Sequence, residues 1–247
     1  MIRGGCSFMK RSQEEIWLEH TKNIRVDDII YEYKNSSPFQ MQFVEYIENS
    51  ECNLNKKIIE IGCETGVASL LISDKFEKTL LDLNPMAIEL CKKAFGELRK
   101  NADFIVADMF DMPIDDGSFD VVFNAGVIEH FSFNERICIL KEYSRILKSG
   151  GAMYIAFPNH FSLPYRVSYL IYNLFSKWPY PMEYKILNLK KEISMVDGLQ
   201  FEERIVLSKE TLFSWLGFSK LFKNMFVFLD KFLNFEGYLT VVKITKK

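Results

Sequence analysis

The sequence predicts an α/β fold with a mostly parallel sheet, and three observations predict it. Short runs of β-branched and apolar residues alternate with helical patterns over about a hundred residues. A glycine turn joins the first of these runs to the helix that follows it. An alternating apolar pattern over residues 238–245 supplies a last strand. Strands and helices in alternation favour parallel strands joined by right-handed crossovers.

The first predicted strand, residues 58–61, ends in the turn 62–66 (GCETG), and a helical pattern begins at residue 67. Glycine suits such a turn because it accepts positive φ and lets a ligand lie close to the backbone. Ligands of open α/β sheets bind beyond the carboxyl ends of the strands. We therefore expect this turn to be the ligand loop of the molecule.

The remaining elements of the core follow in order. Strands are predicted over residues 78–82, 104–107, 119–124 and 152–157. Asn84 is the expected N-cap of a helix with Pro85 in its first turn, and Ser132 and Glu135 match a capping box for a second helix. The apolar residues at helical spacing in both helices should face the sheet.

Residues 12–50 precede the core and have an amphipathic helical pattern. They are predicted to pack on the flank of the sheet or to form a lid over the ligand loop. His20, Tyr31 and Tyr33 are the polar-tipped residues that favour a lid, whereas Trp17 is assigned to packing.

After the core, residues 158–208 are predicted to be an insertion that opens with an aromatic helix over residues 165–175. Residues 209–216 and 222–235 are further predicted helices. The second of these is rich in Phe and amphipathic, and we expect it to pack on the sheet rather than lie on a membrane.

Composition narrows the class of protein. A chain of 247 residues suits one large domain, and its net charge of −2 with scattered lysines disfavours nucleic-acid binding. Five cysteines without a C-x-x-C motif favour reduced thiols in a cytoplasmic protein. Neither a signal-peptide core nor an apolar run of about 18 residues occurs, so stable membrane insertion is not expected. Since no metal-binding motif of Cys, His or carboxylates occurs, no metal is expected.

The spacing within the ligand loop argues against phosphates. The dinucleotide fingerprint G-x-G-x-x-G is absent, because Glu64 stands at its second glycine, where a carboxylate would repel a pyrophosphate. A P-loop is excluded because no Gly-Lys-Ser/Thr follows. Asp82 lies about 20 residues beyond the loop, a spacing that suits a ribose. The loop therefore favours a nucleoside ligand without phosphates.

Residues 60–66 (EIGCETG) resemble motif I of class I S-adenosylmethionine-dependent methyltransferases. Four further blocks resemble the methyltransferase type 11 group, in order and at ordinary spacing: residues 81–85, 108–120, 127–131 and 142–151. The resemblance covers residues 58–159. Two residues depart from the pattern: Glu64 replaces the middle glycine, and Ser149 replaces the proline before the Gly-Gly pair.

The resemblance implies a Rossmann-like, doubly wound sheet of seven strands, mostly parallel with an antiparallel last strand. The chain is expected to form a single domain with four parts. These are an N-terminal helical lid (1–55), a cofactor-binding core (56–157), an insertion or substrate lid (158–208) and a C-terminal completion of the sheet (209–247). S-adenosylmethionine is the implied cofactor.

The resemblance also assigns cofactor contacts. Asp82 is expected to accept bonds from the ribose hydroxyls, and Asp108 to meet the adenine amino group. Leu83 and Met109 are expected on the faces of the adenine ring. Glu60 is expected either to act toward the methionine end or to hold the loop in shape. The other expected cofactor-binding residues are Gly62, Cys63, Glu64, Gly66 and Asn124.

The implied reaction is an in-line methyl transfer to oxygen, nitrogen or carbon of a small molecule. His130 and His160 each follow a strand end and are the candidate general bases, with packing as the alternative role for each. An apolar or planar acceptor is expected between aromatic rings of the insertion or, alternatively, these rings form ordinary core. These rings are Phe161, Tyr165, Tyr169, Tyr172, Trp178 and Tyr180.

Two other classes of function remain open at this point. One is an S-adenosylmethionine-binding protein without transferase activity, such as a sensor or an inactive partner. The other is a methyltransferase that acts on a protein or a lipid. The identity of the acceptor, the methylated atom and the oligomeric state are left open by the sequence.

Overall fold

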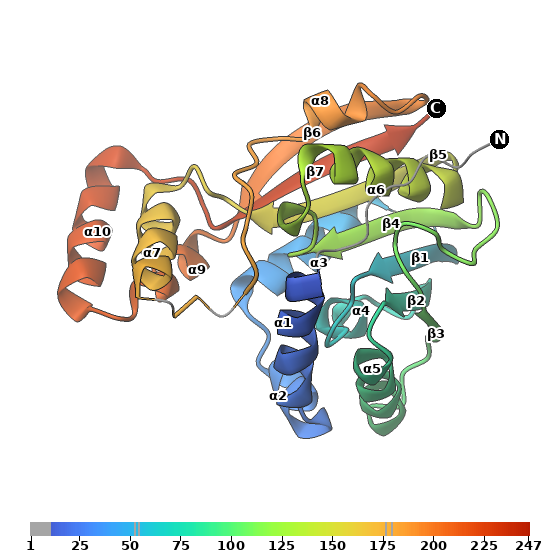
Figure 1. The fold of residues 1–247 in the computed structure, drawn as a ribbon, viewed down its shortest axis with the longest axis horizontal. Helices are drawn as coiled ribbons and strands as arrows, with labels where there is room; N and C mark the ends of the chain where they lie inside the picture. The colour runs from blue at the N-terminus through green and yellow to red at the C-terminus, as the bar shows by residue number, and fades with distance from the viewer. Residues whose placement is uncertain (1–10, 52, 54, 176, 179) are drawn as a thin grey trace.

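A seven-stranded sheet forms the centre of the computed structural model, which describes residues 11–51, 53, 55–175, 177–178 and 180–247. The strands are β1 (Lys56–Ile61), β2 (Phe76–Asp82), β3 (Asp103–Val106), β4 (Phe119–Ala125), β5 (Leu147–Pro158), β6 (Leu199–Leu207) and β7 (Leu239–Lys246). Their order across the sheet is β3-β2-β1-β4-β5-β7-β6 (Figure 1). β7 runs antiparallel to both β5 and β6, whereas the other neighbouring pairs are parallel, which confirms the predicted antiparallel last strand.

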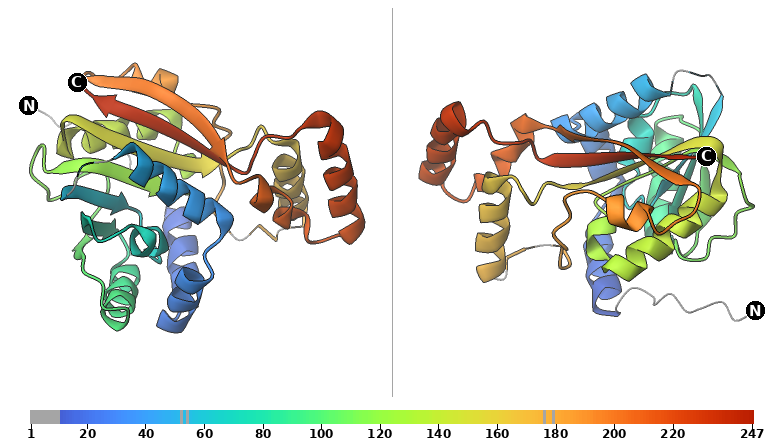
Figure 2. Two further views of the ribbon diagram at one scale, coloured as in Figure 1. Left: turned by 180° about the vertical axis from the view of Figure 1, so that it is seen from behind. Right: turned by 90° about the horizontal axis from the view of Figure 1, so that it is seen from above.

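Helices cover both faces of the sheet (Figure 2). The α-helices are α1 (Arg11–Lys22), α2 (Val26–Lys34), α3 (Pro38–Ser50), α4 (Val67–Leu71), α5 (Pro85–Glu97), α6 (Phe133–Ile146), α7 (Leu163–Leu174), α8 (Lys190–Ile193), α9 (Lys209–Leu212) and α10 (Lys220–Leu233), with 3₁₀ turns η1 (Ile128–His130) and η2 (Ser214–Leu216). Apolar residues of α6 and α8 share one core with the sheet, and those of α3, α4 and α9 share the core on the other side. The doubly wound arrangement is as predicted.

Two helix starts follow from their caps. The Asn84 side chain accepts a hydrogen bond from the Met86 backbone N–H at 3.0 Å, and Pro85 occupies the first turn of α5. At α6, the Glu135 carboxylate accepts from the Ser132 N–H at 2.7 Å, completing a capping box. Both predictions are confirmed: the first cap follows β2 directly, and the second follows β4 after the turn η1.

Strand β6 lies inside the segment predicted to be an insertion. Its sequence, LQFEERIVL, places two glutamates together and so breaks the alternation that would have indicated a strand. The structure explains this break: the register with β7 shifts between Phe201 and Glu203, as at a β-bulge. The bulge moves the later residues to the opposite face, so a single period does not describe the strand.

Helix α10 does not pack on the sheet, so this prediction is wrong. It extends away from the sheet beside α7, in the lobe at the left of Figure 1. Among its residues only Phe226 is buried, whereas Leu221 is 80% exposed and Phe232 is 73% exposed. The sheet offers α10 no free face here, because β7 already packs Val242 into one core and Val241 into the other.

The thiols only partly match the prediction of reduced cysteines. Cys63 and Cys91 are free and buried, but Cys138 is disulfide-bonded, so the prediction is wrong for that residue. Over the described ranges, no helix combines the length and the apolar character needed to cross a membrane.

Candidate functional site

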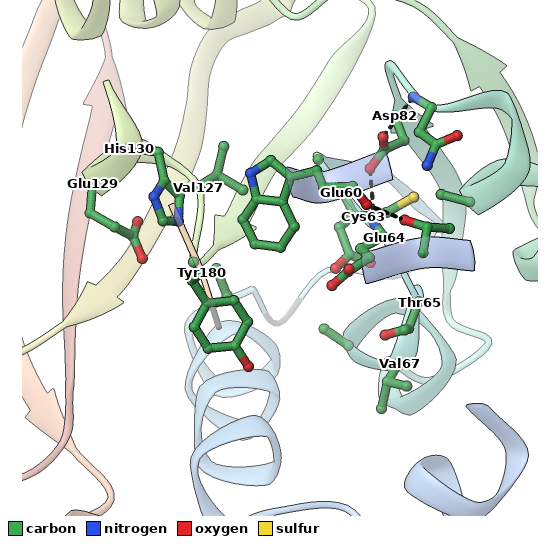
Figure 3. A pocket seen from close by; sticks show the side chains of 18 of the residues that line it. Glu60, Cys63, Glu64, Thr65, Val67, Asp82, Val127, Glu129, His130 and Tyr180 are labelled. Carbon is green, nitrogen blue, oxygen red and sulfur yellow. Dashed lines mark hydrogen bonds between the residues drawn. The ribbon is translucent and has the colours of Figure 1, made fainter. Parts of the chain in front are cut away.

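A cavity of about 370 Å³ opens beyond the carboxyl ends of β1, β2 and β4, within the size range of small-molecule sites. One end is lined by the loop after β1 and the end of β2. The other end is lined by aromatic and acidic side chains from α1, η1, α7, η2 and the segment before β7. Figure 3 shows Asp82 and Cys63 on one side of this cavity and Glu129 and His130 on the other.

Both glycines of the loop are required by its geometry. Gly62 and Gly66 have φ of 74° and 64°, in the left-handed region. A Cβ on Gly66 would lie 2.6 Å from Leu80 Cδ2, and one on Gly62 would lie 2.9 Å from Val127 Cγ2. Gly62 lines the cavity, whereas Gly66 stands behind it at the start of α4.

Glu64, which replaces a glycine of the family pattern, also has a positive φ of 41°. Two contacts hold this strained residue. Its backbone N–H donates to Asp82 Oδ2 at 2.9 Å, and its Oε1 lies 2.6 Å from His20 Nδ1 of α1. The hydrogen bond with the Glu64 carboxylate raises the pKa of His20. Helix α1 is therefore fastened to the loop, as the lid prediction requires, whereas Tyr31 and Tyr33 do not line the cavity.

Asp82 lies at the end of β2 and lines the cavity. Besides the bond from Glu64, its Oδ1 accepts from the Asn84 N–H at 2.9 Å. Burial raises the pKa of Asp82, and the backbone N–H bonds act against this rise. Each carboxylate oxygen can accept more than one hydrogen bond, so both remain suited to ribose hydroxyls.

Glu60 is buried and holds the start of α4. Its carboxylate accepts from the backbone N–H of Ser69 at 3.2 Å and also from the Ser69 hydroxyl. Burial raises the pKa of Glu60 to about 7. These bonds favour the role of holding the loop in shape, although Glu60 also reaches the cavity wall.

The remaining predicted cofactor residues divide into two groups. Cys63, Leu83 and Met109 line the cavity. Asp108 does not: its Oδ1 accepts from the Phe110 N–H at 3.0 Å within a turn. Asn124 is fully buried in the core, where its Nδ2 donates to the Tyr143 hydroxyl at 3.0 Å.

Of the two predicted bases, only His130 lines the cavity. Its Nδ1 lies 3.3 Å from the Met182 carbonyl oxygen, and its ring meets the Trp17 ring edge-on at 5.4 Å. Burial lowers the pKa of His130, which favours the neutral imidazole that a general base requires. Trp17 itself lines the cavity, so its assignment to packing alone is incomplete.

His160 lies behind the cavity wall. It is 1% exposed, and its Nε2 lies 2.8 Å from Glu183 Oε2. Its Nδ1 lies 3.3 Å from Arg166 Nη1. Since a guanidinium can only donate, Nδ1 is the acceptor and the ring proton belongs on Nε2, toward Glu183. The approach of Nε2 to Glu183, which does line the cavity, is a close contact and not a hydrogen bond, since Nε2 has no hydrogen-bond partner among the described residues.

Several lining residues were not predicted from the sequence. Of the six rings expected around the acceptor, only Tyr165 and Tyr180 line the cavity. The aromatic and acidic residues that line the cavity and were not assigned to the site include Trp17, Phe39, Phe43, Glu129, Phe131, Glu183, Trp215 and Tyr238. The sequence gives one signal for Glu129, because it stands next to His130 in the segment that follows β4. The others lie on six separate segments, and no local pattern brings them together.

A family model described as a methyltransferase domain matches residues 59–155. The probable phthiotriol/phenolphthiotriol dimycocerosates methyltransferase 2 of Mycobacterium ulcerans is 26% identical over 150 residues, which make up 53% of this chain and 57% of that protein. The chloroplastic tocopherol O-methyltransferase of Arabidopsis thaliana is 28% identical over 156 residues, or 58% of this chain and 44% of that protein. The chain thus spans about half the length of these curated relatives.

Among solved structures, a geranyl diphosphate C-methyltransferase from Streptomyces coelicolor A3(2) superposes with a TM-score of 0.66 at 14% identity, covering 98% of this chain and 100% of that one. That protein was solved with Mg²⁺, geranyl diphosphate and S-adenosyl-L-homocysteine. The cyclase SpnF has a TM-score of 0.59 at 13% identity, covering 83% of this chain and 81% of its own. At these identities the likeness shows the fold, and the cyclase illustrates that one fold hosts different reactions.

The sheet order, the glycine turn after β1 and the acidic end of β2 together define the fold of class I methyltransferases. With the family match, the chain carries a class I S-adenosylmethionine-dependent methyltransferase domain. The predicted membership and the predicted cofactor, S-adenosylmethionine, are thereby confirmed.

Proposed function

We propose that the chain transfers a methyl group from S-adenosylmethionine to a small-molecule acceptor. The observation that carries this proposal is the single cavity that joins the glycine loop and Asp82 to an aromatic end containing His130. Cofactor and acceptor would share one cavity, as an in-line displacement requires. Holding two reactants in such a geometry can supply about 7–11 kcal/mol of the barrier.

The charges of the cavity fit this cofactor. Among its described lining residues the ionisable side chains are carboxylates, one imidazole, one thiol and tyrosines, with no lysine or arginine. S-adenosylmethionine has a sulfonium and an ammonium group, whereas a phosphorylated cofactor would meet only like charge. When bound, it supplies a methyl group on a sulfonium, which aromatic faces and carboxylates favour.

The proposed contacts use the residues that reach the cavity. Asp82 would hold the ribose hydroxyls, and Leu83 and Met109 would pack against the adenine. Gly62 lets the backbone approach the ligand. We assign no direct contact to Asp108 or Asn124, because neither lines the cavity.

For an acceptor that must lose a proton, His130 is the proposed base. It lines the cavity and burial favours its neutral form, which can take a proton. A positioned base of this kind contributes a factor of roughly 10² to 10⁴ in rate. The rings of Trp17 and Tyr180, whose centroids lie 5.9 Å apart, would exclude water beside it.

The test combines binding and transfer. Calorimetry with S-adenosylmethionine and S-adenosylhomocysteine measures cofactor binding, and incubation with methyl-labelled cofactor and a panel of amines, phenols and carboxylic acids measures transfer. We expect both ligands to bind and at least one acceptor to be labelled. Binding without transfer to any class of acceptor would favour a sensor or an inactive partner instead. Failure to bind either ligand would overturn the proposal.

A lipid-like acceptor is the second candidate, and one observation favours it. Helix α10, which packs against the turn η2, exposes large apolar side chains: Phe228 is 58% exposed and Phe232 is 73% exposed. Such a surface suits contact with an apolar aggregate. Adding a long-chain phenol in detergent micelles to the panel tests this candidate, which predicts labelling of that compound above the water-soluble acceptors.

A further inference from the structure

Two buried carboxyl groups face the aromatic end of the cavity, and neither has a role in the methyl transfer proposed for His130 and Asp82. Glu129 is 1% exposed and Glu183 is 8% exposed, and both line the cavity. Glu129 Oε2 has no hydrogen-bond partner within the part of the chain that the structure describes. A buried polar atom without a partner destabilises the protein unless a ligand supplies one.

The two carboxyl groups differ in what surrounds them. Glu183 Oε2 accepts a hydrogen bond from the Tyr165 hydroxyl at 3.0 Å and lies 2.8 Å from His160 Nε2. Glu129 Oε2 has no such neighbour among the described residues. Burial first, and then the negative charge of Glu183, raise the pKa of Glu129 well above the ordinary value. Glu129 therefore lacks the polar contacts that Glu183 has.

The walls around this pair favour a cation. The rings that line this end belong to Trp17, Phe131, Tyr165, Tyr180, Trp215 and Tyr238. Aromatic faces attract cations, and more strongly where water is excluded. An anionic group such as a phosphate or carboxylate would instead meet two buried carboxyl groups and, within the described lining, no lysine or arginine.

We propose that Glu129 and Glu183 bind the protonated amine of the methyl acceptor, which makes the acceptor a small aromatic or apolar amine. This inference rests on the proposed function and names its substrate class. An ammonium group brings N–H donors for Glu129 Oε2 and the positive charge that this carboxylate lacks. A hydroxyl of the same size brings one donor and no charge.

The sulfonium of the cofactor is the alternative cation for this pair, but the position of the pair favours the acceptor. Figure 3 shows Glu129 across the cavity from Asp82 and Cys63, on the side where Tyr180 and His130 lie. The cofactor loop has carboxylates of its own at Glu64 and Asp82. A comparison of charged and neutral cofactor forms separates the two assignments, because the sulfonium is present in S-adenosylmethionine and absent from S-adenosylhomocysteine.

The experiment is calorimetry at neutral pH on protein saturated with S-adenosylhomocysteine. The probes are benzylamine, phenethylamine and tryptamine, each paired with the alcohol that replaces its amine by a hydroxyl. We expect at least one amine to bind about tenfold more tightly than its alcohol, as for a charge-assisted hydrogen bond. Glu129→Gln, which keeps the shape and removes the charge, should abolish this preference. Glu77→Gln, which removes an exposed charge on β2, should leave it intact.

Unchanged affinity for S-adenosylhomocysteine shows that a variant is folded. If Glu129→Gln has lost this affinity, Glu183→Gln is used in its place. Equal binding of every amine and its alcohol by the unaltered protein would overturn the inference while the proposed function stands. A loss of S-adenosylmethionine affinity in Glu129→Gln, with S-adenosylhomocysteine affinity unchanged, would assign the pair to the sulfonium and also overturn it. Absence of binding to either cofactor form would overturn the proposed function itself.

Discussion

The two ends of the cavity are built in different ways. The cofactor end comes mostly from one stretch, residues 60–85, and backbone groups hold its shape: the N–H groups of Glu64 and Asn84 both donate to Asp82. The acceptor end comes from side chains on distant segments, such as Trp17, Glu129 and Trp215. A site made from local backbone geometry leaves a motif in the sequence, and a site made from dispersed side chains does not.

The largest effect should come from the acceptor end. His130→Asn removes the proposed base, so turnover should fall roughly 100-fold or more while affinity for S-adenosylhomocysteine is unchanged. His160→Asn is the comparison variant. His160 does not line the cavity and contacts Glu183 of the acceptor end rather than the acceptor itself, so turnover at saturating acceptor should fall far less than in His130→Asn. Initial rates at saturating cofactor and acceptor measure both. Full turnover in both variants would show that neither histidine is the base.

A change at the cofactor end should alter binding first. Asp82→Ala removes a charged acceptor from the cavity, and its affinity for S-adenosylhomocysteine should fall about 10- to 100-fold. Asp108→Ala, the matched control at the end of the neighbouring strand, should change affinity little because Asp108 does not line the cavity. Calorimetry measures both values. Equal losses of affinity in the two variants would contradict the proposal that Asp82 contacts the cofactor and Asp108 does not.

Gly66→Ala tests whether backbone geometry holds the loop. Alanine at a φ of 64° costs roughly 1–2 kcal/mol, and its Cβ would also displace Leu80. Thermal unfolding should shift down by about 2–4 °C for each kcal/mol lost. Gly96→Ala, on the exposed side of α5 with open space at its Cβ, is the control and should not lower Tm. A Tm for Gly66→Ala equal to that of the original protein would contradict the requirement for glycine.

The smallest effect concerns the contact between α1 and the loop. The pKa of His20 is raised by Glu64, so protonated His20 stabilises the folded state. This contribution is complete below the ordinary histidine pKa of about 6.5 and is lost as pH rises through the higher folded value. The Tm difference between the original protein and His20→Gln should therefore be largest at mildly acidic pH and shrink above neutrality. A difference that grows with pH would contradict the pairing.

Most of the fold could be predicted because its signals are local. Helix caps at Asn84 and Ser132, the glycine turn and the alternation of strands all depend on neighbours in sequence. The exceptions have physical causes. A bulge breaks the alternating pattern of β6. Helix α10 has the amphipathic pattern of a helix that packs on a sheet, but other elements already cover both faces of β7.

The site could be predicted to the extent that it follows the strands. Asp82 ends β2, His130 lies in the segment after β4, and both reach the cavity. Asp108 follows β3 and Asn124 lies near the end of β4, but a turn and the core respectively engage their side chains. Glu183 ends a segment, residues 178–183, that resembles the lids of small-molecule methyltransferases, but its place in the cavity depends on Tyr165 and His160 from another segment and does not follow from that resemblance.

One junction beside the cavity bears on how such proteins diversify. Asn159 donates its N–H to the Tyr238 carbonyl at 2.7 Å, and Tyr238 donates to the Ser208 carbonyl at 3.1 Å. These two hydrogen bonds join three points of the chain: the exit from β5, the exit from β6 and the entry to β7. Segments that begin and end at a fixed point can lengthen at a cost in closure entropy that grows slowly with length. Residues 208–238 are therefore a segment that can be replaced as a unit, in evolution or in chimeras, without a change to the cofactor loop.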